Sequence, residues 1–205
     1  MVLFHYAAKG ASVVLLILSL AVVASAQNNG IDPALLAKAK AGSATAEYQV
    51  GFDYEYAYPQ DDAQAAVWFR KAAEQGLAEA QFSLGEFYDQ GDGVTQDDAQ
   101  AALWYRKASE QGYAPAQFFL DLDYDGGKGV PQNYTEAYFW LDVATSGNLK
   151  GIGQEDIAKW RDEAVSHLTP TELSSVQERA RKWFKTQSTC GETPWVTTRL
   201  VHLLY

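Results

Sequence analysis

Along residues 44–148, apolar, small and polar positions follow one pattern that occurs three times. Each copy contains two helix-length runs joined by a polar turn, and a glycine closes the second run. The copies occupy residues 44–77, 78–113 and 114–148. The pattern predicts a helix, a turn, a second helix and a stop in each copy. A period of about 35 residues is typical of helical solenoids, in which each helix pair buries its apolar sides only against its neighbours.

Positions that match between the copies have physical explanations. Small residues recur where two helices would pack closely, at Ala46, Ala80 and Ala116. Aromatic residues recur once on each helix, and we expect both sets in the core: Tyr54, Tyr88 and Tyr124 on the first helices, and Trp68, Trp104 and Trp140 on the second. Glycines follow each second helix, where a left-handed residue ends a helix, at Gly76, Gly112 and Gly147.

The turns between paired helices differ among the copies. The second and third copies have Gly-x-Gly-Val turns that begin at Gly91 and Gly127, whereas the first has Tyr56-Ala57-Tyr58-Pro59. Glycine permits the positive φ that such turns need. We expect the polar residues that follow to cap the second helices, because they stand where N-caps belong. A metal site is the other interpretation, but the ligand spacing of an EF-hand is absent. The polar residues are Gln60-Asp61-Asp62, Gln96-Asp97-Asp98 and Gln132-Asn133-Tyr134.

The middle copy resembles the Sel-one-like repeat (SLR) family, which is related to tetratricopeptide repeats. Residues 78–112 carry the pattern A-x-A-Q-x-x-L-G-x-x-Y-x-x-G-x-G-V-x-x-D-x-x-x-A-x-x-W-Y-x-K-A-x-E-Q-G. The first copy departs from it at the turn, and the third has Asp121 where the pattern has glycine. The resemblance spans roughly residues 44–184. It implies an all-α fold, a right-handed α/α superhelical solenoid of three helix pairs with N- and C-terminal capping helices.

The N-terminal residues 1–26 are interpreted as a signal peptide. Lys9 and the amino terminus supply positive charge, residues 13–23 are apolar, and Ala24-Ser25-Ala26 is a small-x-small cleavage signal. The apolar run is shorter than the roughly 20 residues that span a bilayer. With the resemblance, this predicts export to the periplasm of a Gram-negative bacterium and no stable membrane span after cleavage. An uncleaved N-terminal anchor that faces the periplasm is the alternative.

The segments that flank the three copies are interpreted as caps. Residues 27–43 contain a linker and a short N-terminal capping helix that Asp32 can cap. Residues 149–186 contain two C-terminal capping helices, the second of which opens with a capping box at Thr169. Residues 187–205 fit no part of the array and are interpreted as an irregular tail, either folded back or disordered.

Charge and cysteine content exclude several classes of function. The formal net charge of −10 argues against nucleic acid as a partner, because phosphates require a basic face. Cys190 is the only cysteine, so neither an intramolecular disulfide nor a cysteine zinc cluster can form. After residue 26 the histidines are His167 and His202, and neither has a second ligand at helical spacing. We therefore expect no metal and no cofactor.

Catalytic motifs are also missing. G-x-S-x-G, a phosphate loop and H-E-x-x-H do not occur, and Cys190 paired with a histidine is a weak nucleophile candidate. Some disulfide-rich members of the resembled family are linked to penicillin binding and β-lactamase activity. That chemistry usually needs S-x-x-K and K-T-G, but Lys185-Thr186-Gln187 lacks the glycine and no S-x-x-K follows residue 26. A cell-wall-related enzyme is the alternative, and a non-enzymatic role is the prediction.

The first helices offer a binding surface, since they usually line the concave side of such solenoids. Aligned positions form columns that we select as candidate protein-binding residues: Tyr48, Phe82 and Phe118; Gln49, Ser83 and Phe119; and Phe52, Glu86 and Leu122. The rings of the first column either pack between helices or contact a partner. Two neighbouring columns contain acids, Asp53, Phe87 and Asp123, and Glu55, Asp89 and Asp125. The fully acidic column either favours a basic partner or is a solvated edge.

These observations predict an exported scaffold or adaptor that binds a protein or peptide through its concave helical surface. A role within an envelope or secretion-related complex is one form of this hypothesis.

Overall fold

The computed structural model describes residues 30–56, 60–146 and 154–189, and the regular structure in these ranges is helical. The all-α prediction is confirmed. The helices are α2 (Pro33–Lys40), α3 (Ala44–Tyr56), α4 (Asp62–Glu74), α5 (Ala78–Gln90), α6 (Asp98–Glu110), α7 (Ala114–Gly126), α8 (Tyr134–Ser146), α9 (Gln154–Ser166) and α10 (Pro170–Thr189). The predicted signal peptide, Gly147 and the tail from Cys190 onward lie outside the described residues.

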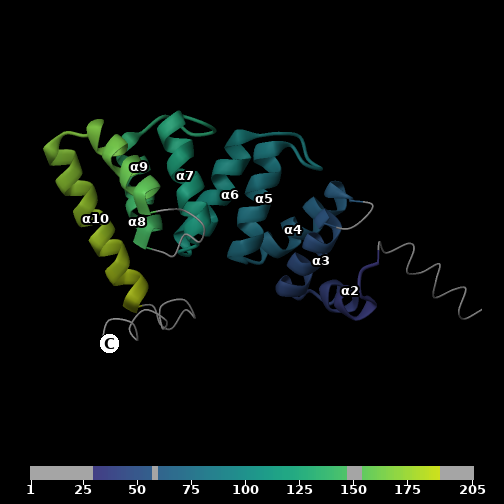
Figure 1. The fold of residues 1–205 in the computed structure, drawn as a ribbon. Coiled ribbons are helices and arrows are strands. Elements are labelled where there is room, and N and C mark those ends of the chain that lie inside the picture. The colour runs from purple at the N-terminus through teal and green to yellow at the C-terminus, as the bar shows by residue number, and fades with distance from the viewer. Residues whose placement is uncertain (1–29, 57–59, 147–153, 190–205) are drawn as a thin grey trace, which may run out of the picture.

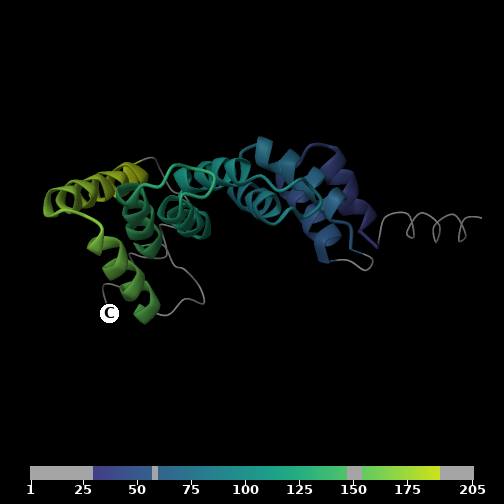
Figure 2. The same cartoon turned by 90° about the horizontal axis from the view of Figure 1, so that it is seen from above.

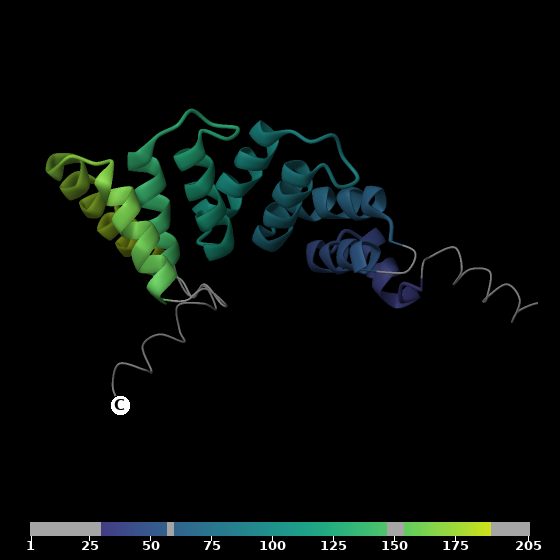
Figure 3. The same ribbon diagram turned by 45° about the horizontal axis from the view of Figure 1, so that its top comes forward.

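The helices follow one another in chain order as an elongated array (Figure 1). We call α3 and α4 unit 1, α5 and α6 unit 2, and α7 and α8 unit 3. The two helices of each unit pack together, and the second helix of units 1 and 2 also packs against the first helix of the next unit. The α5–α6 and α7–α8 connections lie along one edge of the array, the turn edge (Figure 3). The predicted solenoid of helix pairs is confirmed.

Helices outside the units cover both ends of the array. At the N-terminal end α2 packs against α3, and at the C-terminal end α9 and α10 both pack against α8. Seen from above, α9 and α10 diverge from one another (Figure 2). The start predicted for the irregular tail is wrong by three residues, because α10 continues through Thr189. Gln187 Nε2 contacts the Glu110 carbonyl at 3.4 Å, which ties this last turn to the end of α6.

No helix in the described ranges is both long enough and apolar enough to cross a membrane.

The core divides into clusters that repeat along the array. Each tryptophan is buried beside an apolar residue of its unit's first helix: Trp68 with Val50, Trp104 with Leu84, and Trp140 with Leu120. The three tryptophans therefore occupy equivalent surroundings, as the repeat predicts. Of the tyrosine column, Tyr124 is buried, while Tyr54 and Tyr88 are partly buried against the core.

Polar contacts between units repeat with the same period. Arg70 Nη2 donates to the Tyr88 hydroxyl at 2.7 Å, and Arg106 makes the same bond to Tyr124. In unit 3 the position of these arginines holds Asp142, whose Oδ1 lies 3.6 Å from Arg161 Nη2 of α9. Unit 3 thus has an acid at the position where units 1 and 2 have arginine, and this acid faces an arginine of the capping helix α9.

The capping prediction is confirmed at the second helix of every unit. Asp61 Oδ1 accepts from the Gln64 amide and Asp97 Oδ1 from the Gln100 amide, both at 3.0 Å. Asn133 Oδ1 accepts from two amides of α8 at 3.1 Å. The end caps also form as expected: Asp32 accepts from Ala34 at 2.9 Å, and Thr169 exchanges hydrogen bonds with Glu172.

The second glycine of each Gly-x-Gly turn is needed for close packing between units. Gly93 has φ of +63°, and a Cβ there would collide with the backbone carbonyl of Asp62 at the start of α4. Gly129 has φ of +68° and would collide with Asp98 at the start of α6 in the same way. Unit 1 follows only the short helix α2, so no preceding second helix demands a glycine there. Most of the turn of the first copy, residues 57–59, lies outside the described residues.

Candidate functional site

Two contacts between units can be compared position by position. We call the contact of unit 1 with unit 2 the first junction, and that of unit 2 with unit 3 the second junction. At the first junction three equivalent positions hold phenylalanine: Phe52, Phe69 and Phe87. At the second junction the same positions hold polar residues: Glu86, Tyr105 and Asp123. We call these three residues, together with Asp89, the polar cluster.

Tyr105 forms the floor of the polar cluster. Its ring covers Gly85, where a Cβ would lie 2.6 Å from ring carbons, and it lies 5.7 Å from the Phe82 ring and 5.3 Å from the Phe119 ring. The side chain is fully buried, and its hydroxyl makes no hydrogen bond within the described ranges. Burial, followed by the negative charges of Asp89, Glu86 and Asp123, raises the pKa of Tyr105. The negative charges that act on this hydroxyl are therefore those of Asp89, Glu86 and Asp123.

The carboxyl groups around this hydroxyl are difficult to ionise. Asp123 is 6% exposed, and its Oδ2 has no hydrogen-bond partner among the described residues. Burial and then the charge of Asp89 raise the pKa of Asp123 to about 7, although Lys128 opposes the shift. Burial and then the charges of Glu55 and Asp89 raise the pKa of Glu86 to about 7. Both groups therefore titrate near neutral pH.

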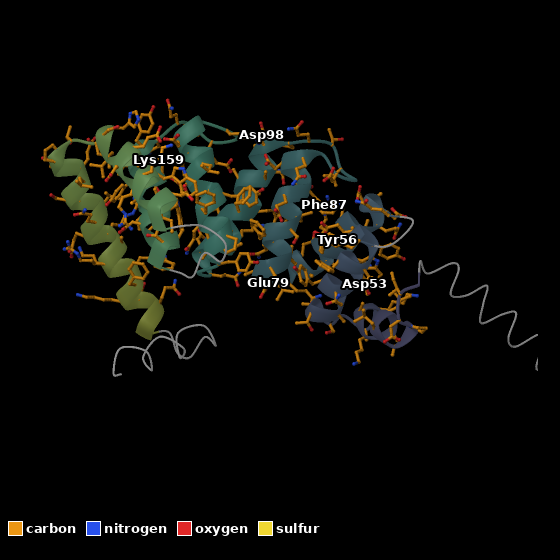
Figure 4. The ribbon with its side chains drawn as sticks, in the orientation of Figure 1. Asp53, Tyr56, Glu79, Phe87, Asp98 and Lys159 are labelled. Atoms are coloured by element: carbon orange, nitrogen blue, oxygen red, sulfur yellow. The ribbon has the colours of Figure 1, made fainter. Side chains whose placement is uncertain are left out.

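One cation lies at the edge of the polar cluster. Lys128, in the turn between α7 and α8, forms an ion pair with Asp89, and its Nζ lies 3.8 Å from Asp98 Oδ1. Figure 4 shows Asp98 at the turn edge, and Glu79 toward the opposite edge. The residue equivalent to Lys128 in unit 2 is Asp92, which adds negative charge near Glu55. The two junctions therefore differ in charge as well as in polarity.

The structure brings three of the nine predicted binding residues to the polar cluster. Glu86 is part of it, and the half-buried rings of Phe82 and Phe119 flank Tyr105, 5.4 Å from one another. The Phe118 ring instead packs 5.0 Å from Trp160 of α9. Phe82 and Phe118 therefore pack between helices, one of the two predicted alternatives, and each keeps part of its surface exposed. Contact with a partner stays a prediction.

The other predicted residues lie toward unit 1 or at the end of the array. Tyr48 is half-buried, with its ring 5.6 Å from Phe69, and its hydroxyl hydrogen-bonds Ser83. Gln49 is exposed and donates to Asp53 at 3.1 Å. Two apolar side chains of the set, Phe52 and Leu122, are 41% and 48% exposed. The nine residues occupy positions i, i+1 and i+4 of α3, α5 and α7, so they share one face of each helix, and we call these faces together the first-helix face.

Sequence reasoning missed Tyr105 and Lys128 as members of the site. Tyr105 lies on a second helix, and the search for binding residues covered first helices alone. Comparing the copies position by position would have found it, because Phe69 and Tyr105 are equivalent and differ by one hydroxyl. Lys128 is the middle residue of a turn that appeared purely structural.

The third copy has Asp121 where the other two have glycine, and the residue that covers this position explains the difference. Gly51 and Gly85 are covered by the rings of Phe69 and Tyr105, which leave no room for a Cβ. In unit 3 the covering residue is the smaller Leu141, so a side chain fits at Asp121. Asp121 is buried, and burial followed by the charge of Asp125 raises its pKa to about 8.

In the part of the chain that the structure describes, no three His, Cys, Asp or Glu side chains are placed to hold a metal ion. His167 lies outside the polar cluster and stacks on Tyr134 with ring centroids 4.1 Å apart.

The fold and the first-helix face define a helical-repeat protein of the tetratricopeptide-like class. The family model described as Sel1 repeat matches residues 44–77, 78–113, 114–148 and 166–186, more than half of the chain. The chain therefore belongs to the Sel1 repeat family. The last matched segment covers most of α10, which the sequence interpretation treated as a cap.

Solved structures similar to this chain are also repeat proteins. One is c5321, a protective antigen present in uropathogenic Escherichia coli strains and displaying an SLR fold; it is 31% identical with a TM-score of 0.64 over 78% of this chain. This chain spans only 35% of c5321. Another is a Sel1 repeat protein from Oxalobacter formigenes, 36% identical with a TM-score of 0.53, over 55% of this chain and 87% of that one. No curated protein matches this chain significantly.

Proposed function

We propose that this chain is an exported, non-enzymatic scaffold or adaptor that binds a protein or peptide through its first-helix face. The observation that carries the proposal is the composition of that face. It combines half-buried rings at Tyr48, Phe82 and Phe119 with the exposed apolar side chains of Phe52 and Leu122. Rigid aromatic groups that are only partly buried supply large contact area at low entropic cost, as in protein interfaces.

The rigidity of the array supports the same role. The rings are held by contacts with core residues, so little ordering remains when a partner binds. Tyr48 and Phe82 occupy equivalent positions on α3 and α5, and Phe52 and Leu122 do so on α3 and α7. Such a regular spacing suits an extended peptide or a helix of the partner. An envelope or secretion-related complex is the context that the export prediction favours.

Site-specific photocrosslinking tests the binding face. A photoreactive phenylalanine analogue at Phe52 or Leu122 should capture the partner in cells. The matched controls are Val67 and Leu103, each 42% exposed at equivalent positions of the second helices α4 and α6. Crosslinks that form equally from all four positions, or only from the second helices, would contradict the proposal.

Export is tested separately by fractionating cells that express the full chain. The proposal expects the mature protein in the periplasmic fraction, with an N-terminus at Gln27. Recovery from the cytoplasm would refute the exported role while leaving the binding face open to test. Hydrolysis of a chromogenic β-lactam by the purified protein, lost on substitution of one polar residue, would favour the enzyme alternative.

A further inference from the structure

The second junction carries buried polar groups in positions that the repeat can fill with phenyl rings. Three positions differ between the junctions, and the second junction has Glu86, Tyr105 and Asp123 there. The Tyr105 hydroxyl and Asp123 Oδ2 are both buried without a hydrogen bond among the described residues. Buried polar groups in native proteins are nearly always paired, so these two oxygens have room for a hydrogen-bond donor that the described residues do not supply.

We propose that the polar cluster of Glu86, Asp89, Asp123 and Tyr105 is a receptor for a guanidinium group, supplied by an arginine side chain of the bound partner. This inference rests on the proposed function, because it names what one point of the first-helix face recognises.

The charge of the polar cluster selects a cation. Three carboxyl groups and a tyrosine oxygen can accept hydrogen bonds, and the nearby cation is Lys128. Lys128 engages Asp89 and Asp98 at the turn edge, on the outer side of the cluster. With pKa values of about 7, the carboxyl groups of Glu86 and Asp123 are partly ionised at neutral pH, and Lys128 only partly offsets the rise in the pKa of Asp123.

The surroundings favour a guanidinium over an ammonium ion. The rings of Phe82 and Phe119 flank the polar cluster, and each keeps part of its surface exposed. A guanidinium is flat, stacks on aromatic faces and carries five N–H donors that match carboxylates in pairs. An ammonium ion is more strongly hydrated and does not stack in this way.

The polar cluster is reachable from the side on which the partner is proposed to bind. Glu86 is partly exposed, and 21% of the Asp89 side chain is exposed. These two carboxyl groups form the outer layer, while Asp123 and Tyr105 lie behind them. An arginine would thus pair first with Glu86 and Asp89, and its remaining donors would face the buried oxygens.

Guanidinium binding should release protons, which gives the inference a distinctive readout. The charged groups that act on Glu86 and Asp123 are Glu55, Asp89, Asp98 and Lys128, and the tyrosines coupled to them are Tyr48, Tyr56, Tyr105 and Tyr113. In the free protein Glu86 and Asp123 have pKa values of about 7, and a bound cation lowers both. Arginine should therefore bind more tightly as the pH rises from 6 to 8.

A titration of the ¹⁵N-labelled full chain with N-acetyl-L-arginine amide tests the inference by NMR. We expect saturable shifts at the amides of Glu86, Asp89 and Asp123. N-acetyl-L-citrulline amide has the same shape without the charge and should bind about tenfold or more weakly, the loss expected for one charge-assisted contact. The lysine analogue should lie between them. Equal shifts with citrulline, or an arginine affinity that does not rise with pH, would overturn the inference.

Variants locate the response and separate it from misfolding. Glu86→Gln with Asp123→Asn should abolish the arginine shifts, whereas Asp53→Asn, which alters the position in unit 1 equivalent to Asp123, should retain them. Tyr105→Phe copies the residue of the first junction and is expected to fold. It therefore tests the site even if the double variant does not fold. It should weaken arginine binding several-fold. Arginine shifts that survive in both variants would refute the site.

The outcome is distinguishable from a failure of the proposed function. Suppose that positions 52 and 122 crosslink to the partner equally in wild type and in the Glu86→Gln, Asp123→Asn variant, and that the arginine probe does not bind the wild-type chain. The receptor is then refuted and the binding face stands. If the probe binds and no partner crosslinks, the polar cluster is confirmed and the wider face is refuted.

Discussion

The first and second junctions share one scaffold and differ in what they bury. Both have a glycine under a second-helix ring, at Gly51 and Gly85, and both have the arginine–tyrosine bond between units. At the first junction the Phe69 and Phe87 rings meet edge to face, 5.2 Å apart. At the second, the equivalent positions bury the Tyr105 hydroxyl and Asp123 Oδ2, neither of which has a hydrogen bond among the described residues. The polar residues are therefore not required by the repeat fold.

The difference has an energetic meaning. A buried polar group without a partner costs about 1–3 kcal/mol, whereas an aromatic pair contributes roughly 0.5–1.5 kcal/mol beyond its buried area. The second junction should therefore be the weaker of the two, although it lies in the middle of the array. Local instability of this kind is typical of functional sites rather than of scaffolding.

The largest effect is expected from importing the acid of the second junction into the first. Phe87→Asp removes a ring that is 4% exposed and leaves an unpaired carboxyl group against Phe69. We expect the free energy of unfolding to fall by about 4 kcal/mol, measured by chemical denaturation. Phe52→Glu introduces the other acid at an exposed position and should change stability by only about 0.5 kcal/mol. Similar losses of stability in both variants would show that burial does not determine how much an acid destabilises the first junction.

A reciprocal exchange of one hydroxyl group tests the comparison more finely. Phe69→Tyr should lower the free energy of unfolding by about 2 kcal/mol, because the hydroxyl would enter an apolar junction without a partner. Tyr105→Phe should raise it by about 1 kcal/mol, because it removes a buried hydroxyl that has no described partner. Thermal and denaturant unfolding of the two variants measure both effects. Destabilisation by Tyr105→Phe would mean that the hydroxyl is satisfied in the folded protein.

The pH dependence of stability should differ between wild type and a neutralised second junction. Glu86 and Asp123 have folded pKa values of about 7, above the values near 4 of unfolded carboxyl groups. The folded state therefore holds more protons between about pH 4 and 7, so their contribution to stability falls as the pH rises through that window and is constant above it.

The Glu86→Gln, Asp123→Asn variant should lose this slope, a difference of about 1 kcal/mol per pH unit after allowance for partial exposure. Denaturation curves from pH 4.5 to 8 provide the measurement. Asp53→Asn, at the position in unit 1 equivalent to Asp123, is the control. Parallel stability curves for wild type and the double variant would contradict the expectation.

The sequence predicted the fold because repetition reveals which positions are structural. Ala46, Trp68 and Gly76 have equivalents in every copy, so their roles follow from periodicity and helix-end chemistry. The site depends instead on positions at which the copies have different residues. A column of equivalent positions on the first helices does not reveal contacts with a second helix. Phe82 and Glu86 were selected from the first helices, but Tyr105 belongs to the next helix and meets them only through packing over Gly85. The length of α10 depends on a contact with Glu110 that no local pattern contains.

The smallest effect concerns the turn residues that give the junctions opposite charge. Lys128→Asp copies Asp92 and removes the ion pairs with Asp89 and Asp98, while Asp92→Lys places a cation near Glu55. These side chains are partly exposed, so we expect a loss of about 0.5 kcal/mol for the first variant and a gain of similar size for the second. Both changes should shrink in 1 M salt, where screening acts within a few ångströms. If Lys128→Asp instead unfolds the protein, or if the salt dependence is absent, then Lys128 stabilises the turn by packing, and the charge difference between the junctions is incidental to their stability.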